Sequence, residues 1–99
     1  MPFTVGQLVA VPCTVERGSV TGEVLVTIDL PGERLSGFVR SDLVDGTTVR
    51  AIVAAVGGSS MTVELPGSFF IRATRRASVP VGWAASHLRG LPTRARPRP

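Results

Sequence analysis

The chain has 99 residues, of which 43% are hydrophobic, and its formal net charge is +4. This length allows one domain with one modest core. The single cysteine excludes an internal disulfide and indicates a reducing compartment, so we expect a cytoplasmic protein. No apolar run approaches the ~20 residues that span a bilayer. The first six residues lack the basic start of a secretory signal, and no membrane partner is expected.

Composition favours β structure over helix. Fifteen valines and nine threonines stand against eight leucines, and β-branched side chains fit pleated strands better than helices. Eleven glycines and eight prolines supply turns between short elements. We therefore expect an all-β protein with many tight connections.

The first predicted strand covers residues 7–16, where apolar side chains recur at every second position. Its inward face consists of Val9, Val11, Cys13 and Val15. Pro12 lies on the opposite face and lacks a backbone donor, which favours an edge strand or a bulge. The surroundings of Cys13 predict a small buried hydrophobe, with a reactive thiol as the alternative.

Two further strands are predicted at residues 23–30 and 35–40, with Pro31-Gly32 as the turn between them. The inward face of the first of these consists of Val24, Val26, Ile28 and Leu30. Its other face is polar, an alternation typical of an antiparallel sheet with one face in water. Residues 41–44 predict a single helical turn, and a tight turn follows at Asp45-Gly46.

Residues 48–56 predict a fourth strand, although the composition of 52–56 also fits a helix. Gly57–Ser60 closes a hairpin to a fifth strand at 61–65. Residues 68–74 are a candidate sixth strand. Together with the earlier strands, these segments favour one small antiparallel barrel of five or six strands.

A short helix is predicted from about Pro80 to Leu88, with Pro80 in its first turn and Gly90 as its stop signal. Trp83 and His87 are four residues apart, so they share one face of this helix. Beyond Gly90 the chain is rich in proline and arginine, which cannot build a core. The predicted organisation is a β-barrel domain at 1–76, a short helix packed on the barrel at 77–89, and a flexible tail at 90–99.

Residues 24–44 (VLVTIDLPGERLSGFVRSDLV) resemble the second half of bacterial SH3-like domains. In that family a strand pair ends in a Gly-aromatic-Val step, and a short turn bearing a serine follows. The matching residues are Gly37, Phe38, Val39, Arg40, Ser41, Asp42, Leu43 and Val44. Phe38 replaces the usual Trp or Tyr, and the chain has no tyrosine to line an aromatic groove. The resemblance implies a small SH3-like antiparallel barrel, here followed by a short C-terminal helix.

The charge is divided unevenly along the chain. Residues 1–66 hold four arginines and all seven acids, for a net charge of −3, whereas residues 67–99 hold seven arginines and no acid. Such a basic end can bind an anionic partner, lie on the acidic part of its own chain, or act as a solvated tail. The absence of lysine fits selection for bidentate phosphate contacts and equally fits a GC-rich genome.

No catalytic or metal-binding motif is present in the sequence. The single histidine has no nucleophile placed near it by a recognisable motif, and one His with one Cys cannot complete a four-ligand site. We therefore expect no enzymatic activity, no metal and no cofactor. A subunit of a larger enzyme is the remaining enzymatic alternative.

The favoured hypothesis is a non-enzymatic interaction module that binds an unidentified protein partner through an edge strand or a groove near Phe38 and Trp83. Trp83 has a second interpretation, as an anchor that holds the helix on the barrel. The alternative function is nucleic-acid binding through the basic C-terminal third, with Phe70 as a stacking aromatic beside Arg72. The candidate partner-binding residues are Phe38, Phe70, Arg72, Arg75, Arg76 and Trp83.

Overall fold

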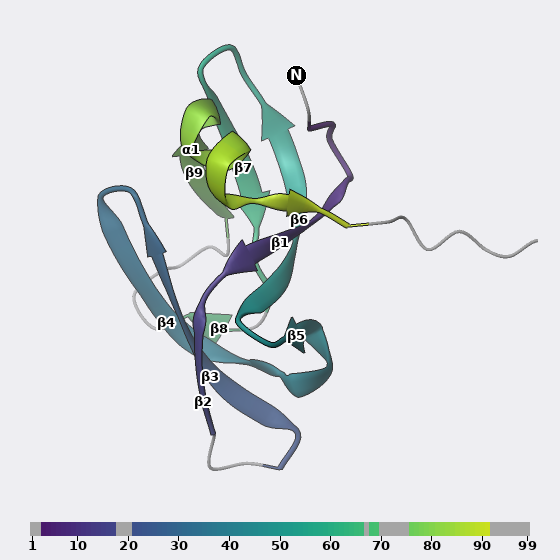
Figure 1. Ribbon diagram of the computed structural model, residues 1–99, viewed down its shortest axis with the longest axis vertical. Helices are drawn as coiled ribbons and strands as arrows, with labels where there is room; N and C mark the ends of the chain where they lie inside the picture. The colour runs from purple at the N-terminus through teal and green to yellow at the C-terminus, as the bar shows by residue number, and fades with distance from the viewer. Residues whose placement is uncertain (1–2, 18–20, 67, 70–75, 92–99) are drawn as a thin grey trace, which may run out of the picture.

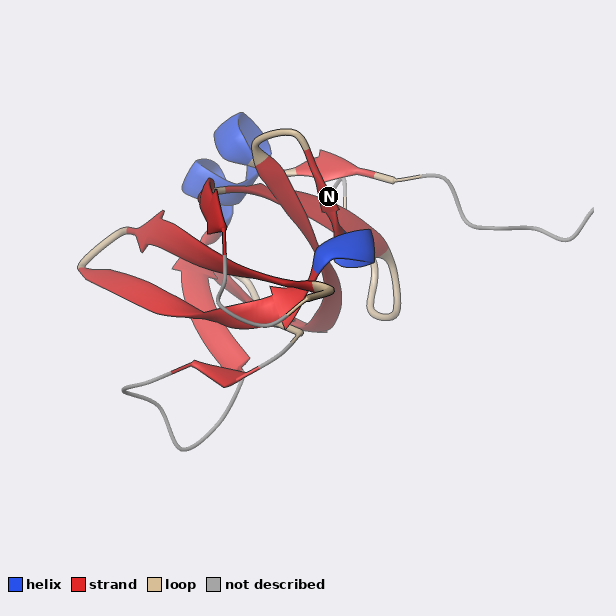
Figure 2. Cartoon of the chain, turned by 90° about the horizontal axis from the view of Figure 1, so that it is seen from below, coloured by secondary structure: helices blue, strands red, loops and turns tan. Residues whose placement is uncertain are grey.

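The structure, a computed structural model, describes residues 3–17, 21–66, 68–69 and 76–91. Across these residues the chain forms ten strands, one α-helix and one 3-10 turn (Figure 1). Figure 2 shows the two helical segments lying apart, with strands between them. All strand pairs described are antiparallel, as predicted.

The strands are β1 (Leu8–Pro12), β2 (Thr14–Arg17), β3 (Glu23–Leu30), β4 (Glu33–Arg40), β5 (Val44–Asp45), β6 (Thr48–Val56), β7 (Ser60–Glu64), β8 (Ser68–Phe69), β9 (Arg76–Pro80) and β10 (Arg89–Gly90). The 3-10 turn η1 spans Ser41–Leu43, and the helix α1 spans Val81–His87. The first sheet has the strand order β10-β1-β6-β7-β9, with β5 also paired to β6. The second sheet has the order β2-β3-β4-β8. The single closed barrel expected from the sequence is therefore replaced by two sheets.

The two sheets are joined at Cys13, which divides the predicted strand at 7–16 in two. Pro12 is exposed at the end of β1, and Thr14 begins β2 opposite Thr27. The Cys13 N–H donates to the Thr47 carbonyl oxygen at 2.8 Å. The missing donor of Pro12 is tolerated because the chain leaves the first sheet at this corner. Because the chain turns at this corner, one alternating apolar pattern supplies β1 to the first sheet and β2 to the second.

The hairpin of β3 and β4 confirms the predicted turn and the alternation of faces. Gly32 has φ +85°, which is the conformation that the third position of a type II turn requires and that glycine adopts without strain. On the outer face, the hydroxyls of Thr27 and Ser36 lie 3.1 Å apart, and Arg34 Nε donates to Asp29 Oδ1 at 2.6 Å. The outer face is polar because it lies in water.

β6 is a strand over its whole length, so the alternative helical interpretation of residues 52–56 is wrong. Val53 is fully buried opposite Val63 of β7, and the register shifts between Val53 and Ala55. This β-bulge moves the strand off strict alternation, which explains why the local pattern resembled a helix. Cross-strand packing against β7 decides the conformation there.

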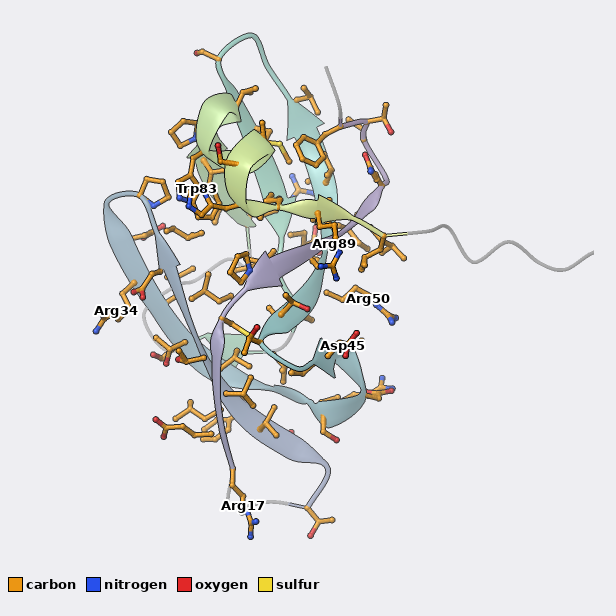
Figure 3. All side chains as sticks on the ribbon, viewed as in Figure 1. Arg17, Arg34, Asp45, Arg50, Trp83 and Arg89 are labelled. Atoms are coloured by element: carbon orange, nitrogen blue, oxygen red, sulfur yellow. The ribbon has the colours of Figure 1, made fainter. Side chains whose placement is uncertain are left out.

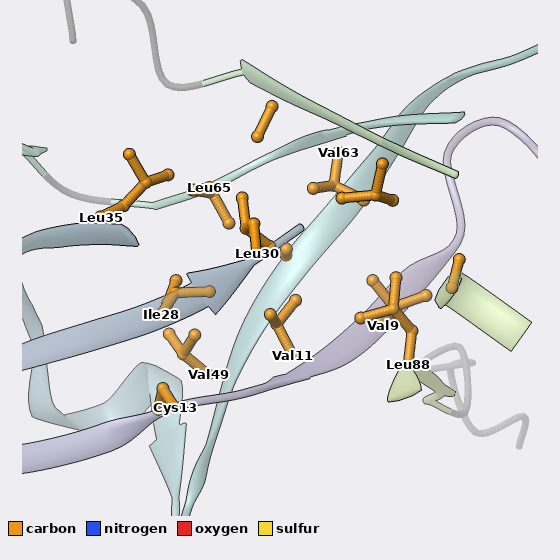
Figure 4. Packing of buried hydrophobic residues seen from close by; sticks show 14 of the residues in the cluster. Val9, Val11, Cys13, Ile28, Leu30, Leu35, Val49, Val63, Leu65 and Leu88 are labelled. Carbon is orange, nitrogen blue, oxygen red and sulfur yellow. The ribbon is translucent and has the colours of Figure 1, made fainter. Parts of the chain in front are cut away.

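One hydrophobic core collects side chains from both sheets (Figure 4). Ile28, Met61 and Leu65 are the largest fully buried side chains among the described residues. The inward face predicted for β3 is confirmed, because its alternate residues from Val26 to Leu30 are buried and Val24 is half-buried. Within the described residues, no helix has the length and apolar character needed to cross a bilayer.

The C-terminal third supplies the strands at both edges of the first sheet. β9 pairs with β7 at one edge, and β10 pairs with β1 at the other. Between them, the Val81 N–H at the start of α1 donates to the Ser59 carbonyl oxygen at 3.0 Å. Ala84 on α1 and Leu88 just after it are buried in the core. The division at 1–76, 77–89 and 90–99 stays a prediction, and residues 92–99 lie outside the described part.

Candidate functional site

An open cleft of about 340 Å³ lies where the chain crosses from the first sheet to the second. Its lining comes from three parts of the chain: the corner, the outer face of β3, and α1. The lining residues are Pro12, Cys13, Thr14, Thr27, Asp29, Trp83 and His87. Figure 3 shows Trp83 between α1 and the hairpin of β3 and β4. The cleft thus combines an aromatic wall with a polar strand face.

The cleft exists because β2 is shorter than β3. β2 begins at Thr14, opposite Thr27, whereas β3 continues to Leu30. β2 pairs with one edge of β3 only as far as Thr27. Over residues 28–30, no described strand pairs with that edge. A strand edge without a partner presents backbone donors and acceptors that another extended chain can pair with.

Trp83 and His87 form the aromatic wall, as the helical spacing predicted. Their ring centroids are 4.6 Å apart and the rings are tilted by 14°, which is a stacked arrangement. His87 Nδ1 lies 3.0 Å from the Trp83 carbonyl oxygen, and because a carbonyl only accepts, Nδ1 is the donor. Trp83 is half-buried and also packs against the core. The anchoring and cleft-lining roles of Trp83 therefore coexist, and the indole is held in place before any ligand binds.

Cys13, Asp29 and His87 are the residue types of a cysteine hydrolase, and all three line the cleft. The surroundings of these three side chains indicate structural roles. Burial raises the pKa of the Cys13 thiol, whereas a nucleophile needs a lowered pKa. The Asp29 carboxylate accepts from Arg34, and His87 Nδ1 donates to a backbone oxygen. The geometry therefore supports recognition more than covalent chemistry at this cleft.

The thiol of Cys13 makes the stability of the protein pH-dependent. Because burial raises its folded-state pKa, the stability that it contributes is complete below the unfolded-state pKa of about 8.5. That contribution is lost as the pH rises through the folded-state pKa. We expect the free energy of unfolding, measured with urea, to fall as the pH is raised above about 8.5. Cys13→Ala should remove this part of the pH dependence.

A kinetic measurement checks the same prediction independently. Iodoacetamide should alkylate Cys13 at least roughly tenfold more slowly in the native protein than in urea, since the thiolate is the reacting form. Equal alkylation rates in the two states would contradict the structural role of this cysteine.

Of Phe38 and Trp83, which the sequence hypothesis placed near one groove, only Trp83 lines this cleft. Phe38 is half-buried on the outer face of the second sheet, opposite Leu25, and is not among the residues that line the cleft. Trp83 lines this cleft without Phe38, and a groove shared by the two side chains stays a prediction.

Of the basic cluster predicted at residues 70–76, only Arg76 lies within the described residues. Arg76 is exposed on β9, and its Nε lies 3.3 Å from Glu64 Oε1 on the neighbouring strand β7. Phe70, Arg72 and Arg75 lie outside the described residues. Arg76 is thus paired within its own sheet, whereas the alternative in which the basic tail lies on the acidic part of the chain stays a prediction.

Two other arginines of the described chain also pair with acids: Arg34 with Asp29, and Arg40 with Asp42 at 2.5 Å. These pairs are exposed, so each contributes at most about 1 kcal/mol to stability. Their main consequence is that they neutralise charge on the second sheet.

The cleft residues Pro12, Thr14, Thr27 and Asp29 were not candidate site residues in the sequence. The one local signal was Pro12, whose position inside an apolar strand pattern marks a corner. Comparisons with protein-family models, with curated proteins and with solved structures gave no match. In the part of the chain that the structure describes, no three His, Cys, Asp or Glu residues are grouped as a metal site requires.

Proposed function

We propose that this chain is a small β-sheet interaction module that binds an extended segment of a partner protein in the cleft beside Trp83. The observation that carries the proposal is the stacked pair of Trp83 and His87 beside an incompletely paired edge of β3. A partner segment would add a short strand along residues 28–30 and place a side chain on the indole. Backbone pairing would supply affinity, and the indole would supply specificity.

Three features of the cleft favour a protein segment as the ligand. Trp is enriched among residues that dominate binding energy, and this indole is already immobilised by stacking and by the core. The strand face beside it carries hydroxyl groups and an Asp29 carboxylate that is neutralised by Arg34. The residues lining the cleft include no arginine to neutralise a phosphate backbone, so nucleic acid is the poorer match here.

The finer fold assignment belongs to the same proposal. The segment 24–44 that resembles bacterial SH3-like domains forms the hairpin of β3 and β4, then η1 and the start of β5. This order agrees with the resemblance, and we propose an SH3-like relationship for that segment, in a cytoplasmic protein. Nucleic-acid binding by the C-terminal third stays a prediction, because three of its four named residues are outside the described part.

Capture of partners from a lysate of the native host tests the proposal. Trp83→Ala should weaken capture of a specific partner by roughly 30-fold, the effect of removing an interface residue worth about 2 kcal/mol. Thr14→Arg is a second variant that fills the cleft from an exposed position and should weaken capture without disturbing the core. Phe38→Ala is the matched control, because it removes an aromatic side chain outside the cleft.

Circular dichroism and urea unfolding should first show that each variant is folded. Quantitative mass spectrometry of the captured proteins then compares the variants. Loss of the partner in Phe38→Ala alone, or equal capture by Trp83→Ala, Thr14→Arg and the unmodified protein, would overturn the cleft as the binding site.

A further inference from the structure

Two arginines that are far apart in the sequence lie in one row of the first sheet. Ala10 of β1 is paired with Arg50 of β6 on one side and with Arg89 of β10 on the other. Directly paired residues point to the same face, so both arginine side chains stand on the outer face. Neighbouring strands are about 4.8 Å apart, which places the two Cα atoms roughly 10 Å from each other. Both side chains are labelled in Figure 3.

Neither arginine is neutralised by the described chain. Arg50 and Arg89 are exposed, and neither makes an ion pair with a residue that the structure describes. The strand register places two carboxylates near Arg50: Asp45, which pairs with Thr48, and Glu64, which pairs with Ile52. Asp45 makes no ion pair with a described residue, and Glu64 is ion-paired with Arg76. Ala10 is only 2% exposed although it lies on the outer face, as expected where long arginine stems flank a small residue.

An apolar row runs beside the two arginines. Leu8 of β1 is paired with Ile52 of β6, and the Leu91 N–H donates to the Leu8 carbonyl oxygen at 2.8 Å. Ile52 is 45% exposed and Val5 is 65% exposed, and they are the exposed large hydrophobic side chains of the described chain. Exposed aliphatic residues gathered beside unpaired charges are typical of interaction surfaces.

Two shallow hollows lie along this row. One, of about 180 Å³, is lined by residues that include Arg50, Ile52 and Leu43, and the other, of about 480 Å³, by residues that include Val5 and Leu91. Leu8 lines both, so the hollows adjoin. The outer face of the first sheet therefore offers two adjoining hollows whose linings contain aliphatic side chains, with two cationic groups along one side.

We propose that this face binds an acidic segment of a partner protein, in which carboxylates meet Arg50 and Arg89 and aliphatic side chains cover Leu8 and Ile52. Arginine binds carboxylates through two parallel hydrogen bonds, so two unpaired guanidinium groups select a segment with two acids. The surface is distinct from the cleft, and the inference does not rest on the function proposed there.

Charge and composition argue against two other occupants of this face, the chain's own C-terminal residues and single-stranded nucleic acid. The chain's own residues 92–99 carry three arginines and no acid, so they lack the carboxylates that Arg50 and Arg89 would bind. Single-stranded nucleic acid needs aromatic side chains on which bases stack, and the residues lining the two hollows include none. An aliphatic, acidic protein segment satisfies both the apolar row and the two cations.

Selection from a random 12-residue peptide display library tests the chemistry without a known partner. The unmodified protein should enrich peptides that carry at least two Asp or Glu together with Leu, Ile or Val. A fluorescent copy of the most enriched peptide should bind at least about tenfold more weakly to the double variant Arg50→Gln and Arg89→Gln. Ile52→Asp should weaken binding similarly, and Asp45→Asn should strengthen it by removing a competing carboxylate.

Arg17→Gln is the matched control, since Arg17 is exposed at the far end of the second sheet (Figure 3) and makes no ion pair with the described residues. It should bind the peptide as the unmodified protein does, and so should Trp83→Ala, which separates this surface from the cleft. The proposal is overturned if the selected peptides are not enriched in acids, or if the double arginine variant binds the peptide as tightly as the unmodified protein. It is also overturned if a 20-nucleotide single strand binds more tightly than the peptide, or if the protein forms a dimer that the arginine substitutions dissociate.

Discussion

A chain that ends at residue 76 is expected not to fold, because the residues removed supply both edges of the first sheet. Truncation deletes most of β9 and all of α1 and β10. It removes four buried side chains, Ala77, Val79, Ala84 and Leu88. Burying a valine or leucine contributes about 1.5–3 kcal/mol each. The pairing of β1 with β10 and the pairing of β7 with β9 are lost besides. The sum is comparable to the whole stability of a small domain.

Amide dispersion in a two-dimensional NMR spectrum measures the outcome. The chain 1–76 should give the narrow dispersion of an unfolded protein, whereas the chain 1–91, which keeps every described strand, should give the spectrum of the full-length protein. A folded, cooperatively unfolding 1–76 chain would instead support residues 1–76 as a self-standing domain, as the composition of the sequence suggested.

Replacement of Ile28 by alanine is expected to lower the free energy of unfolding by about 2–5 kcal/mol. Ile28 is 0% exposed at the centre of β3, opposite Leu35, and it belongs to the core shared by both sheets (Figure 4). Alanine leaves a cavity that close-packed neighbours fill only partly. Urea unfolding followed by Trp83 fluorescence measures the change.

Two variants make this prediction specific to packing. Ile28→Val removes one methylene and should cost only about 0.5–1.5 kcal/mol. Ile52→Ala makes the same substitution on the outer face of the first sheet, where the side chain is 45% exposed, and should change stability by less than about 1 kcal/mol. Similar losses at Ile28 and Ile52 would contradict the assignment of the core face.

Local patterns in the sequence were sufficient for the longer strands and their turns. The alternation in β3 and in the first half of β6, and the Pro31-Gly32 turn, appear in the structure where they were predicted. β9 also carries alternation, since Ala77 and Val79 are buried between exposed neighbours, but two buried residues before a helix are too weak a signal. β10 has only two residues and no periodicity, so it is specified by its pairing with β1.

The candidate sites also have parts that local sequence patterns predicted and parts that only the structure brings together. The stacking of Trp83 on His87 followed from a four-residue spacing within one helix. The rest of the cleft comes from the corner at residues 12–14 and from β3. The row of Arg50 and Arg89 joins residues 39 positions apart through Ala10. No window of the sequence contains those neighbours, because register between strands depends on the packing of the whole sheet.

The sequence by itself determined the all-β class, the helix of the C-terminal third and the concentration of arginine after Gly67, since these depend on composition and local spacing. Only the tertiary structure decided that the strands form two sheets joined at Cys13, which residues line the Trp83 cleft, and which of the described arginines are paired. The physical reason is that alternation sets which face of a strand is buried, whereas long-range pairing and core packing set which strands, and therefore which side chains, become neighbours.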